Sequence, residues 1–398
     1  MKISWIVPLF MGCVAAWGMV ETPATFPEPD QLPVLKELPD PFLMNDGHRV
    51  STPGEWAKRR VEITEMLLHY EYGHLPPAPK SVFVEDETVR EAFDGKARVH
   101  EFVLRMNGKD GFSMHAGVIV PTTGGPKFPA VVAVDPVFQP HVETTARQII
   151  EHGYAFAGFV YHDVDNDKDD RSAGVYPFYP ECDGASLIMW AWGAMRVADY
   201  LCTRGDIDTA HMAVTGHSRC GKAALLAGAL DERFALVAPH GSGAGGAGSF
   251  RIQPKGVETL DFITKPNRFH YWFQPRLRDF IDKEDRLPFD QHFLKALVAP
   301  RALLSLDGLG DQWANPEGTK ETYLAAMPVF AFLGAGDKNL CWFREGGHDL
   351  VEEDWRALLD AADFAFFGKP LPAGFNAVPA GAASTHFSWS APAENSGK

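Results

Sequence analysis

The chain has 398 residues, of which 45% are hydrophobic and 22% are charged. This composition is that of a globular protein with ample material for a core, and the length is long for one domain and short for three. The net charge is −15, and no basic run offsets the excess of acidic residues. Electrostatic repulsion therefore argues against nucleic acid and acidic membrane surfaces as partners.

The N-terminal residues are typical of an export signal. Lys2 supplies a positive start, residues 3–16 are almost wholly apolar, and small residues precede a cleavage point after residue 18. A membrane anchor is the alternative, but the apolar run is shorter than the roughly 20 residues that a spanning helix needs. A lipoprotein would use Cys13, yet Phe10 stands where a Leu is expected. We therefore predict a signal peptide over residues 1–18 and a periplasmic or secreted protein.

Four cysteines follow the predicted signal peptide, and an exported protein could pair them. They are Cys182, Cys202, Cys220 and Cys341. Four cysteines allow three pairings that the sequence does not rank, and isolated buried thiols are an equal alternative.

The remaining chain divides by composition into three segments. Residues 19–44 are rich in Pro and acidic side chains and predict an extended lead-in. Residues 45–370 carry the periodic apolar pattern of a folded domain. Residues 371–398 are rich in Ala, Pro and Ser, so we expect this tail to be largely without structure.

Within the domain, apolar β-rich runs alternate with amphipathic or apolar helical stretches. The predicted strands, in chain order, cover residues 102–105, 116–120, 130–134, 154–160, 212–215, 236–239, 302–306 and 339–344. The predicted helices cover residues 56–72, 144–152, 186–201, 221–229, 319–332 and 355–367. The first two strands should pair through turn residues at 107–111. Strand–helix alternation on this scale predicts an α/β fold, a three-layer sandwich around a mostly parallel sheet.

The strongest chemical motif is Thr-Gly-His-Ser-Arg-Cys-Gly-Lys at residues 215–222, where a short strand passes into a helix. Such a turn lifts the residue at its tip, Ser218, above the sheet, and the helix N-terminus beneath it suits a developing oxyanion. The second glycine of the usual Gly-x-Ser-x-Gly elbow is displaced by one place, because Cys220 occupies its position. An ordinary turn is the alternative, but the strand–turn–helix context favours the nucleophile of an α/β-hydrolase fold.

A serine nucleophile of this type needs an acid and then a histidine further along the chain. His348 follows the last predicted strand, where the base of this fold lies, whereas His217 and His240 come from turns with other uses. Asp311 follows the preceding strand and would hold the imidazole tautomer. Asp307, nearer the strand end, is the alternative acid, and a turn or helix-capping role is the alternative for Asp311.

Two other motifs are given lesser roles. The acidic run at residues 163–170 has Lys168 and Gly174 where a calcium-binding EF-hand needs Gly and Glu, so we expect a solvated acidic loop beside the site. The glycine-rich run at residues 241–246 lacks the Lys and Ser/Thr of a phosphate loop. A close backbone approach to the site explains it equally well.

Several stretches together resemble the glucuronoyl esterases, carbohydrate esterase family fifteen. The resemblance extends from Asn45 to Phe367 and is carried by the residues 215–222 motif, Trp-Ala-Trp-Gly at 190–193, Ser-Gly-Ala-Gly-Gly at 242–246, Leu-Pro-Phe-Asp-Gln-His at 287–292 and Ala-Pro-Arg at 299–301. It implies an α/β-hydrolase fold, Ser218 as nucleophile, His348 as base, and Arg219 as a stabiliser of the oxyanion. The sugar-binding residues that the resemblance implies are Lys222, Trp313 and, more weakly, Glu258. Their alternatives are a solvated helix residue for Lys222 and a core position for Trp313.

The chain departs from the fungal members at two positions. Gly241 stands where they carry a glutamate, so the acid must come from elsewhere, which favours Asp311. His217 stands where they carry a cysteine, so a disulfide between the serine and histidine loops cannot form. Both departures resemble the bacterial branch.

The resemblance thus implies an esterase that cleaves 4-O-methyl-glucuronate esters between glucuronoxylan and lignin alcohols, and we expect a monomer that needs no metal or organic cofactor. An acetyl-xylan deacetylase is the nearest alternative, since it would use the same triad. A carbohydrate-binding pseudoenzyme is the alternative from another class.

Overall fold

The computed structural model describes residues 26–139, 142–379 and 383–393. The predicted signal peptide, residues 1–18, and Cys13 lie outside them. Among the described residues, no helix is both long enough and apolar enough to cross a bilayer. The four cysteines at 182, 202, 220 and 341 are free thiols, as the unpaired alternative expects, but only Cys220 and Cys341 are buried.

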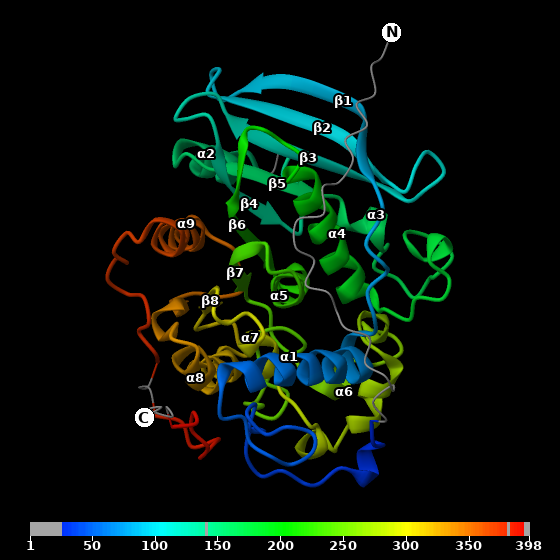
Figure 1. Cartoon of the computed structure of the whole chain (residues 1–398), viewed down its shortest axis with the longest axis vertical. Helices are drawn as coiled ribbons and strands as arrows, with labels where there is room; N and C mark the ends of the chain where they lie inside the picture. The colour runs from blue at the N-terminus through cyan, green and yellow to red at the C-terminus, as the bar shows by residue number, and fades with distance from the viewer. Residues whose placement is uncertain (1–25, 140–141, 380–382, 394–398) are drawn as a thin grey trace.

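A single nine-stranded sheet organises the described part of the chain (Figure 1). Its strands lie in the order β1 (Val82–Ala92), β2 (Ala97–Met106), β3 (Ser113–Pro121), β5 (Ala155–Phe159), β4 (Phe128–Ala133), β6 (Ile207–His217), β7 (Phe234–His240), β8 (Ala302–Gly308) and β9 (Asn339–Arg344). The pairings from β1 to β5 are antiparallel, with Phe102 opposite Ala116, and those from β5 to β9 are parallel. The predicted mostly parallel sheet is confirmed.

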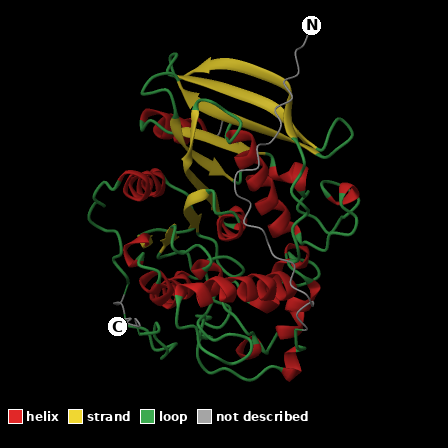
Figure 2. Ribbon diagram, in the orientation of Figure 1, coloured by secondary structure: helices red, strands yellow, loops and turns green. Residues whose placement is uncertain are grey.

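Helices cover both faces of the sheet, which gives the predicted three layers (Figure 2). One face carries α2 (Glu143–Glu151) and α9 (Glu352–Phe367), and the other carries α1 (Pro53–Leu67), α4 (Ser186–Leu201), α5 (Arg219–Leu230), α7 (His292–Ala296) and α8 (Pro316–Phe332). The short helices are α3 (Tyr161–Val164), α6 (Leu260–Ile263) and a π-helical turn that continues α1, η2 (Leu68–Tyr72). The 3₁₀ turns are η1 (Pro29–Gln31), η4 (Tyr176–Phe178), η5 (His270–Trp272), η6 (Pro275–Phe280), η7 (Glu284–Arg286) and η8 (Gly336–Lys338).

The apolar run of β4 shows why the core has two halves. Ala130 and Val132 point into the core beneath α4 and α5, whereas Val131 and Ala133 point into the core beneath α2 and α9. Because successive side chains of a strand point to opposite faces, a continuous apolar run is buried on both. All the residues of α4 are buried, including Trp190 and Trp192, because this helix lies between the sheet and the outer elements.

Each element predicted from the sequence is present, most of them extended by a few residues, and the bounds of α4 and β9 match the prediction. The strand β1 was not predicted. Its residues 85–92 are largely charged and exposed, since β1 pairs on one side only, at the sheet edge. An edge strand of this kind lacks the alternating apolar pattern on which the prediction rests.

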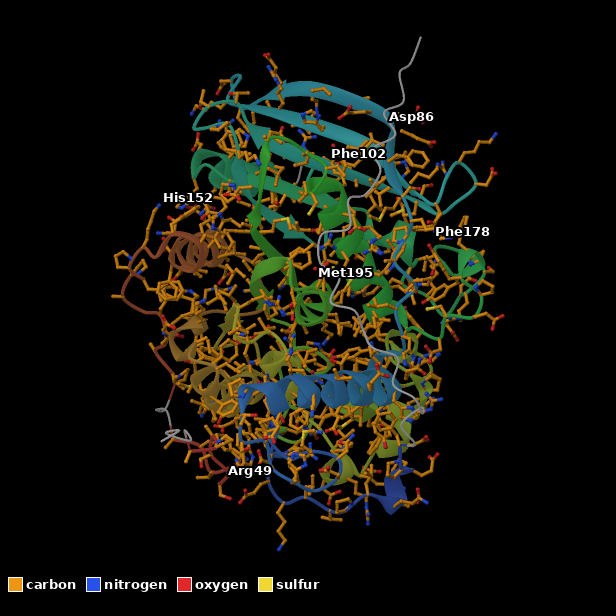
Figure 3. The ribbon with its side chains drawn as sticks, viewed as in Figure 1. Arg49, Asp86, Phe102, His152, Phe178 and Met195 are labelled. Atoms are coloured by element: carbon orange, nitrogen blue, oxygen red, sulfur yellow. The ribbon has the colours of Figure 1, made fainter. Side chains whose placement is uncertain are left out.

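The described C-terminal residues differ from the expected loose tail, although they form no helix or strand. The Trp389 indole donates to the carbonyl of Leu38 at 2.9 Å, and Leu38 N–H donates to the carbonyl of His386 at 2.8 Å. Arg49, labelled in Figure 3 beside the C-terminal segment, donates to the carbonyl of Ser390. The lead-in and the tail therefore bind each other, because two aromatic residues in this Ala/Pro/Ser-rich segment supply apolar surface to bury.

Candidate active site

The side chain of Ser218 lies at the sharp junction between β6 and α5. Its φ of 57° is in the left-handed region, which a residue other than glycine adopts at an energetic cost of about 1–3 kcal/mol. A Cβ atom on Gly221 would lie 2.8 Å from the carbonyl oxygen of His240, and one on Gly216 would collide with the carbonyl of Cys220. The usual motif has its second glycine at the position of Cys220. Here Gly221 allows the close approach of α5 to the neighbouring backbone, so a cysteine can stand at position 220.

The predicted base and acid meet this serine at the carboxyl ends of parallel strands. His348 lies in the loop after β9, and its Nε2 is 2.9 Å from Oγ of Ser218. Its Nδ1 is 2.5 Å from Oδ2 of Asp311, which lies in the loop after β8. The hydrogen bond that His348 makes to the Asp311 carboxylate raises the pKa of His348. Burial alone would raise the pKa of Asp311. The hydrogen bonds from His348 and the Ala314 N–H outweigh burial and lower this pKa.

Asp307, the alternative acid, takes no part in the hydrogen bonds that join Asp311, His348 and Ser218. It is 1% exposed within β8, and burial, partly offset by Lys295, raises its pKa. The hydrogen bond of His348 goes to Asp311, so the geometry favours Asp311.

Gly241 borders the same pair of side chains. A Cβ atom at this position would lie 3.5 Å from Oδ2 of Asp311 and 3.5 Å from Nδ1 of His348. An acidic side chain here would reach the same imidazole nitrogen from another strand. The position where the fungal pattern has a glutamate is therefore a second place from which a carboxylate could pair with His348.

The loop that carries His348 is fixed from two sides. His217 Nε2 donates to the carbonyl oxygen of His348 at 2.6 Å, and Arg344 donates to the carbonyls of Glu345, at 2.9 Å, and Asp349. Burial, reinforced by two neighbouring imidazoles, lowers the pKa of His217 to about 4, so its ring is neutral near pH 7. The sequence interpretation, which gave His217 no part in the site, missed this role.

A buried ion pair supports Arg344 in turn. Its Nε lies 2.8 Å from Oδ1 of Asp354 at the start of α9, and Asp354 Oδ2 accepts from the Val351 N–H at 2.9 Å. Despite burial, His240 and Arg344 hold the pKa of Asp354 at about 2. The histidine loop is thus attached to both β9 and α9.

Arg219, the residue after Ser218, begins α5. Its guanidinium pairs with the carboxylate of Asp167 and lies 4.9 Å from the ring centroid of Trp272 and 5.4 Å from that of Phe269. The first N–H groups of a helix have no partner within it, so α5 also offers backbone donors next to Ser218.

The acidic loop differs from the expected solvated one at two of its carboxylates. Asp165 is 1% exposed and accepts from Tyr176 at 2.6 Å and from Ser186 at 2.9 Å, and Asp167 accepts from the Trp272 indole at 2.7 Å. The sequence did not show this because the partners come from distant segments. Among the described residues, no grouping of His, Cys, Asp or Glu side chains is arranged to hold a metal ion.

Lys222 and Glu258 lie beneath the glycine-rich loop rather than on an open surface. The Lys222 Nζ donates to the carbonyls of Ser242 at 2.5 Å and Ala244 at 2.6 Å, and to Oε2 of Glu258 at 2.6 Å. The two side chains are 3% and 5% exposed. A lysine ammonium has three N–H groups, and all three are occupied. The expectation that Lys222 presents a free donor to a sugar is therefore not met in this structure.

Trp313 is the exposed aromatic side chain nearest in sequence to Asp311, with 39% of its surface accessible. Its ring meets that of Phe262 edge to face at 4.8 Å. The alternative of a core position is thus wrong for Trp313. A held but exposed indole suits the C–H face of a sugar.

Comparison with known proteins identifies the family of this chain. Residues 103–334 match the family model "Glucuronyl esterase, fungi". The chain is 31% identical over 361 residues to 4-O-methyl-glucuronoyl methylesterase 1 of Wolfiporia cocos, covering 88% of this chain and 83% of that protein. It is also 31% identical to the 4-O-methyl-glucuronoyl methylesterase of Podospora anserina, of which it spans 64%.

Solved structures give the same result. The family 15 glucuronoyl esterase of Caldicellulosiruptor kristjansonii superposes with a TM-score of 0.72 at 33% identity, covering 84% of this chain and 92% of that one. A variant of the Sporotrichum thermophile glucuronoyl esterase in complex with methyl 4-O-methyl-β-D-glucopyranuronate superposes with a TM-score of 0.68 at 26% identity, covering 86% and 91%. The chain therefore belongs to the glucuronoyl esterases of carbohydrate esterase family 15 and has their α/β-hydrolase fold.

Proposed function

We propose that this protein hydrolyses esters of 4-O-methyl-glucuronic acid, such as those joining glucuronoxylan to lignin alcohols, through an acyl-enzyme on Ser218. The observation that carries the proposal is the continuous hydrogen-bonded line from Asp311 through His348 to Ser218. The names of the curated relatives, and the methyl ester bound in a related structure, support a uronate as the acyl group.

The chemistry follows from the geometry of this line. His348 donates its Nδ1–H to Asp311, which leaves the Nε2 lone pair facing Ser218. As Oγ attacks C6 of the uronate, Nε2 accepts the serine proton and then delivers it to the departing alcohol. Water, activated by the same imidazole, attacks the acyl-enzyme and releases free uronate.

Stabilisation of the tetrahedral oxyanion falls to the start of α5. The backbone N–H groups of its first turn directly follow Ser218, and Arg219 is the first residue of that turn. A single preorganised donor of this kind is worth about 10²–10³ in kcat. We assign Arg219 to this role because it directly follows the nucleophile.

The sugar would bind beside Trp313, whose exposed indole can stack on the C–H face of a pyranose. Lys222 and Glu258 would contribute indirectly, by holding the carbonyls of Ser242 and Ala244 in place. Replacing Trp313 by Ala should raise KM with a smaller change in kcat, because the stacking contact is made equally in the ground and transition states.

The test compares two substrates and one variant. The wild-type protein should hydrolyse methyl 4-O-methyl-glucuronate far faster than it deacetylates acetylated xylan, and Ser218→Ala should lose at least about 10⁴-fold in kcat. Faster release of acetate would make the protein an acetyl-xylan deacetylase. Binding of the sugar without turnover would make it a carbohydrate-binding pseudoenzyme, whose one support, the missing acid at Gly241, is weakened by the Asp311 hydrogen bond.

Export, domain limits and monomeric state belong to the same proposal. We expect cleavage after residue 18, a folded unit centred on residues 45–370, and a protein that acts alone on an extracellular or periplasmic polymer. N-terminal sequencing of the protein recovered outside the cytoplasm tests the cleavage. Size-exclusion chromatography with light scattering tests the monomer.

A further inference from the structure

The side chain of Asp167 is held in place by several groups at once. Its Oδ1 accepts from the Trp272 indole N–H at 2.7 Å, and its backbone carbonyl accepts from the Tyr271 hydroxyl at 2.7 Å. Its own N–H donates to Oδ1 of Asp165 at 2.9 Å. The carboxylate is 11% exposed, so water solvates it poorly. Its remaining oxygen, Oδ2, accepts from Nη1 of Arg219.

The Arg219 guanidinium also contacts a stacked aromatic pair. The rings of Phe269 and Trp272 are parallel, with centroids 4.0 Å apart, and the guanidinium lies beside both. A guanidinium has five N–H donors, and within the described part of the chain Arg219 uses only the one at Nη1. No protein acceptor in that part of the chain is recorded for the other four.

The proposed reaction forms two different anions at Ser218, the residue directly before Arg219. The ester is neutral at C6 and becomes negative there only in the tetrahedral state, whereas the free uronate product carries a full carboxylate at the same carbon. A fully charged, unpaired guanidinium would bind that carboxylate strongly, as charge-assisted pairs do. Such a site would retain its product.

We propose that Asp167 is a positioning residue that fixes the Arg219 guanidinium for the oxyanion and, by neutralising its charge, lowers the affinity of the site for the free uronate product. The inference rests on the proposed function. Fixed orientation serves the transition state, because a preorganised donor needs no rearrangement when charge develops. Reduced net charge at Arg219 weakens the binding of the product anion. The binding of the ester is unaffected, because the ester carries no charge at C6.

The test measures inhibition of methyl 4-O-methyl-glucuronate hydrolysis by free 4-O-methyl-glucuronate, at low ionic strength to limit screening. In Asp167→Asn the product inhibition constant should fall about five-fold, as expected for removal of one partly exposed ion pair. The KM of the neutral ester should stay within about two-fold, and kcat should fall through loss of orientation and slower release. Asn suits this test because it tolerates the φ of 58° at this position and keeps an acceptor for Trp272.

Asp169→Asn is the matched control. It removes the same charge from the same loop, but Asp169 is 71% exposed and contacts His270 rather than Arg219. Its inhibition constant should stay near that of the wild type. In the Arg219→Met background, Asp167→Asn should have no effect on product binding.

A loss of affinity for ester and product together in Asp167→Asn would indicate a merely structural role and overturn the inference. An inhibition constant that falls equally in Asp169→Asn, or in the Arg219→Met background, would also overturn it. Absence of ester hydrolysis by the wild-type protein would instead count against the proposed function.

Discussion

His217 Nε2 donates to the backbone carbonyl of His348 at 2.6 Å, so the residue before Ser218 holds the loop that carries His348. Their rings also lie 4.5 Å apart, centroid to centroid. In the fungal pattern a cysteine at this position ties the same two loops through a disulfide. Here a neutral imidazole makes the connection by a hydrogen bond instead.

Replacing His217 by Ala should therefore lower kcat about ten-fold with little change in KM, because a net hydrogen bond is worth about 1 kcal/mol and misplacement of the base adds to its loss. Steady-state kinetics with the methyl ester measures this. His217→Gln, which keeps a side-chain N–H, should recover part of the loss. Equal kinetics for the Ala variant and the wild type would show that Arg344 and Asp354 suffice to place the loop.

The same residue makes folding depend on pH. The folded-state pKa of His217 is about 4, below the value of about 6.5 for an unfolded histidine, so the unfolded chain binds the proton more readily. The stability contributed by His217 should be present above pH 6.5 and be lost as the pH falls from about 6.5 to 4. Urea unfolding across this range, compared with His217→Gln, measures the difference. A variant with an unchanged pH dependence would contradict this assignment.

Asp311 should control the pH dependence of activity. Its hydrogen bond raises the pKa of His348, and the base works only when neutral, so kcat/KM should rise with pH through a midpoint above the ordinary 6.5. Asp311→Asn removes the carboxylate that favours the protonated ring, so the midpoint should fall, and the rate should drop by as much as about 10⁴-fold. A pH–rate profile of both proteins decides this. A midpoint that does not move would remove Asp311 from the role of acid.

The sequence predicted most of the sheet and the three residues of the hydrogen-bonded line, because these depend on local patterns. The apolar run of β4, the glycines around Ser218, and the positions of Asp311 and His348 after successive strands are all readable along the chain. The contact of Asp167 with Arg219 spans 52 residues and that of Trp389 with Leu38 spans 351. No periodicity marks such pairs, since only the folded chain brings them together.

Lys222 shows a different limit of the sequence. The family resemblance implied that Lys222, one helical turn after Ser218, is directed to the ligand, and the structure places Lys222 in the first turn of α5. The side chain is nevertheless buried, since the carbonyls of Ser242 and Ala244 and the carboxylate of Glu258 surround its ammonium. Spacing on a helix gives the direction of a side chain but not the loop that covers it.

The contact between the two ends of the chain should contribute to stability but not to catalysis. Trp389 stacks on Phe387 at 4.6 Å and lies 5.9 Å from the buried His292 ring. Trp389→Ala should lower the free energy of unfolding by about 2 kcal/mol, less than the 3–5 kcal/mol for a fully buried aromatic residue. Thermal unfolding measures this, with Phe367→Ala, an exposed aromatic position, as the control. A kcat that fell in step with stability would show that the tail also shapes the active site.

Gly241 offers a second origin for the acid and a direct test of the geometry. A Cβ atom there would lie 3.5 Å from both Nδ1 of His348 and Oδ2 of Asp311. Gly241→Glu alone should lower activity, because two carboxylates would then compete for one N–H and repel each other, and because φ is +51° at this position. In the Asp311→Asn background the same change should raise kcat at least about ten-fold above that of Asp311→Asn alone, since the new carboxylate restores the charge beside His348. Gly241→Gln in that background is the control, because it has the same length and backbone strain without the charge. Equal rates for the Glu and Gln double variants would show that a carboxylate at residue 241 cannot serve this histidine.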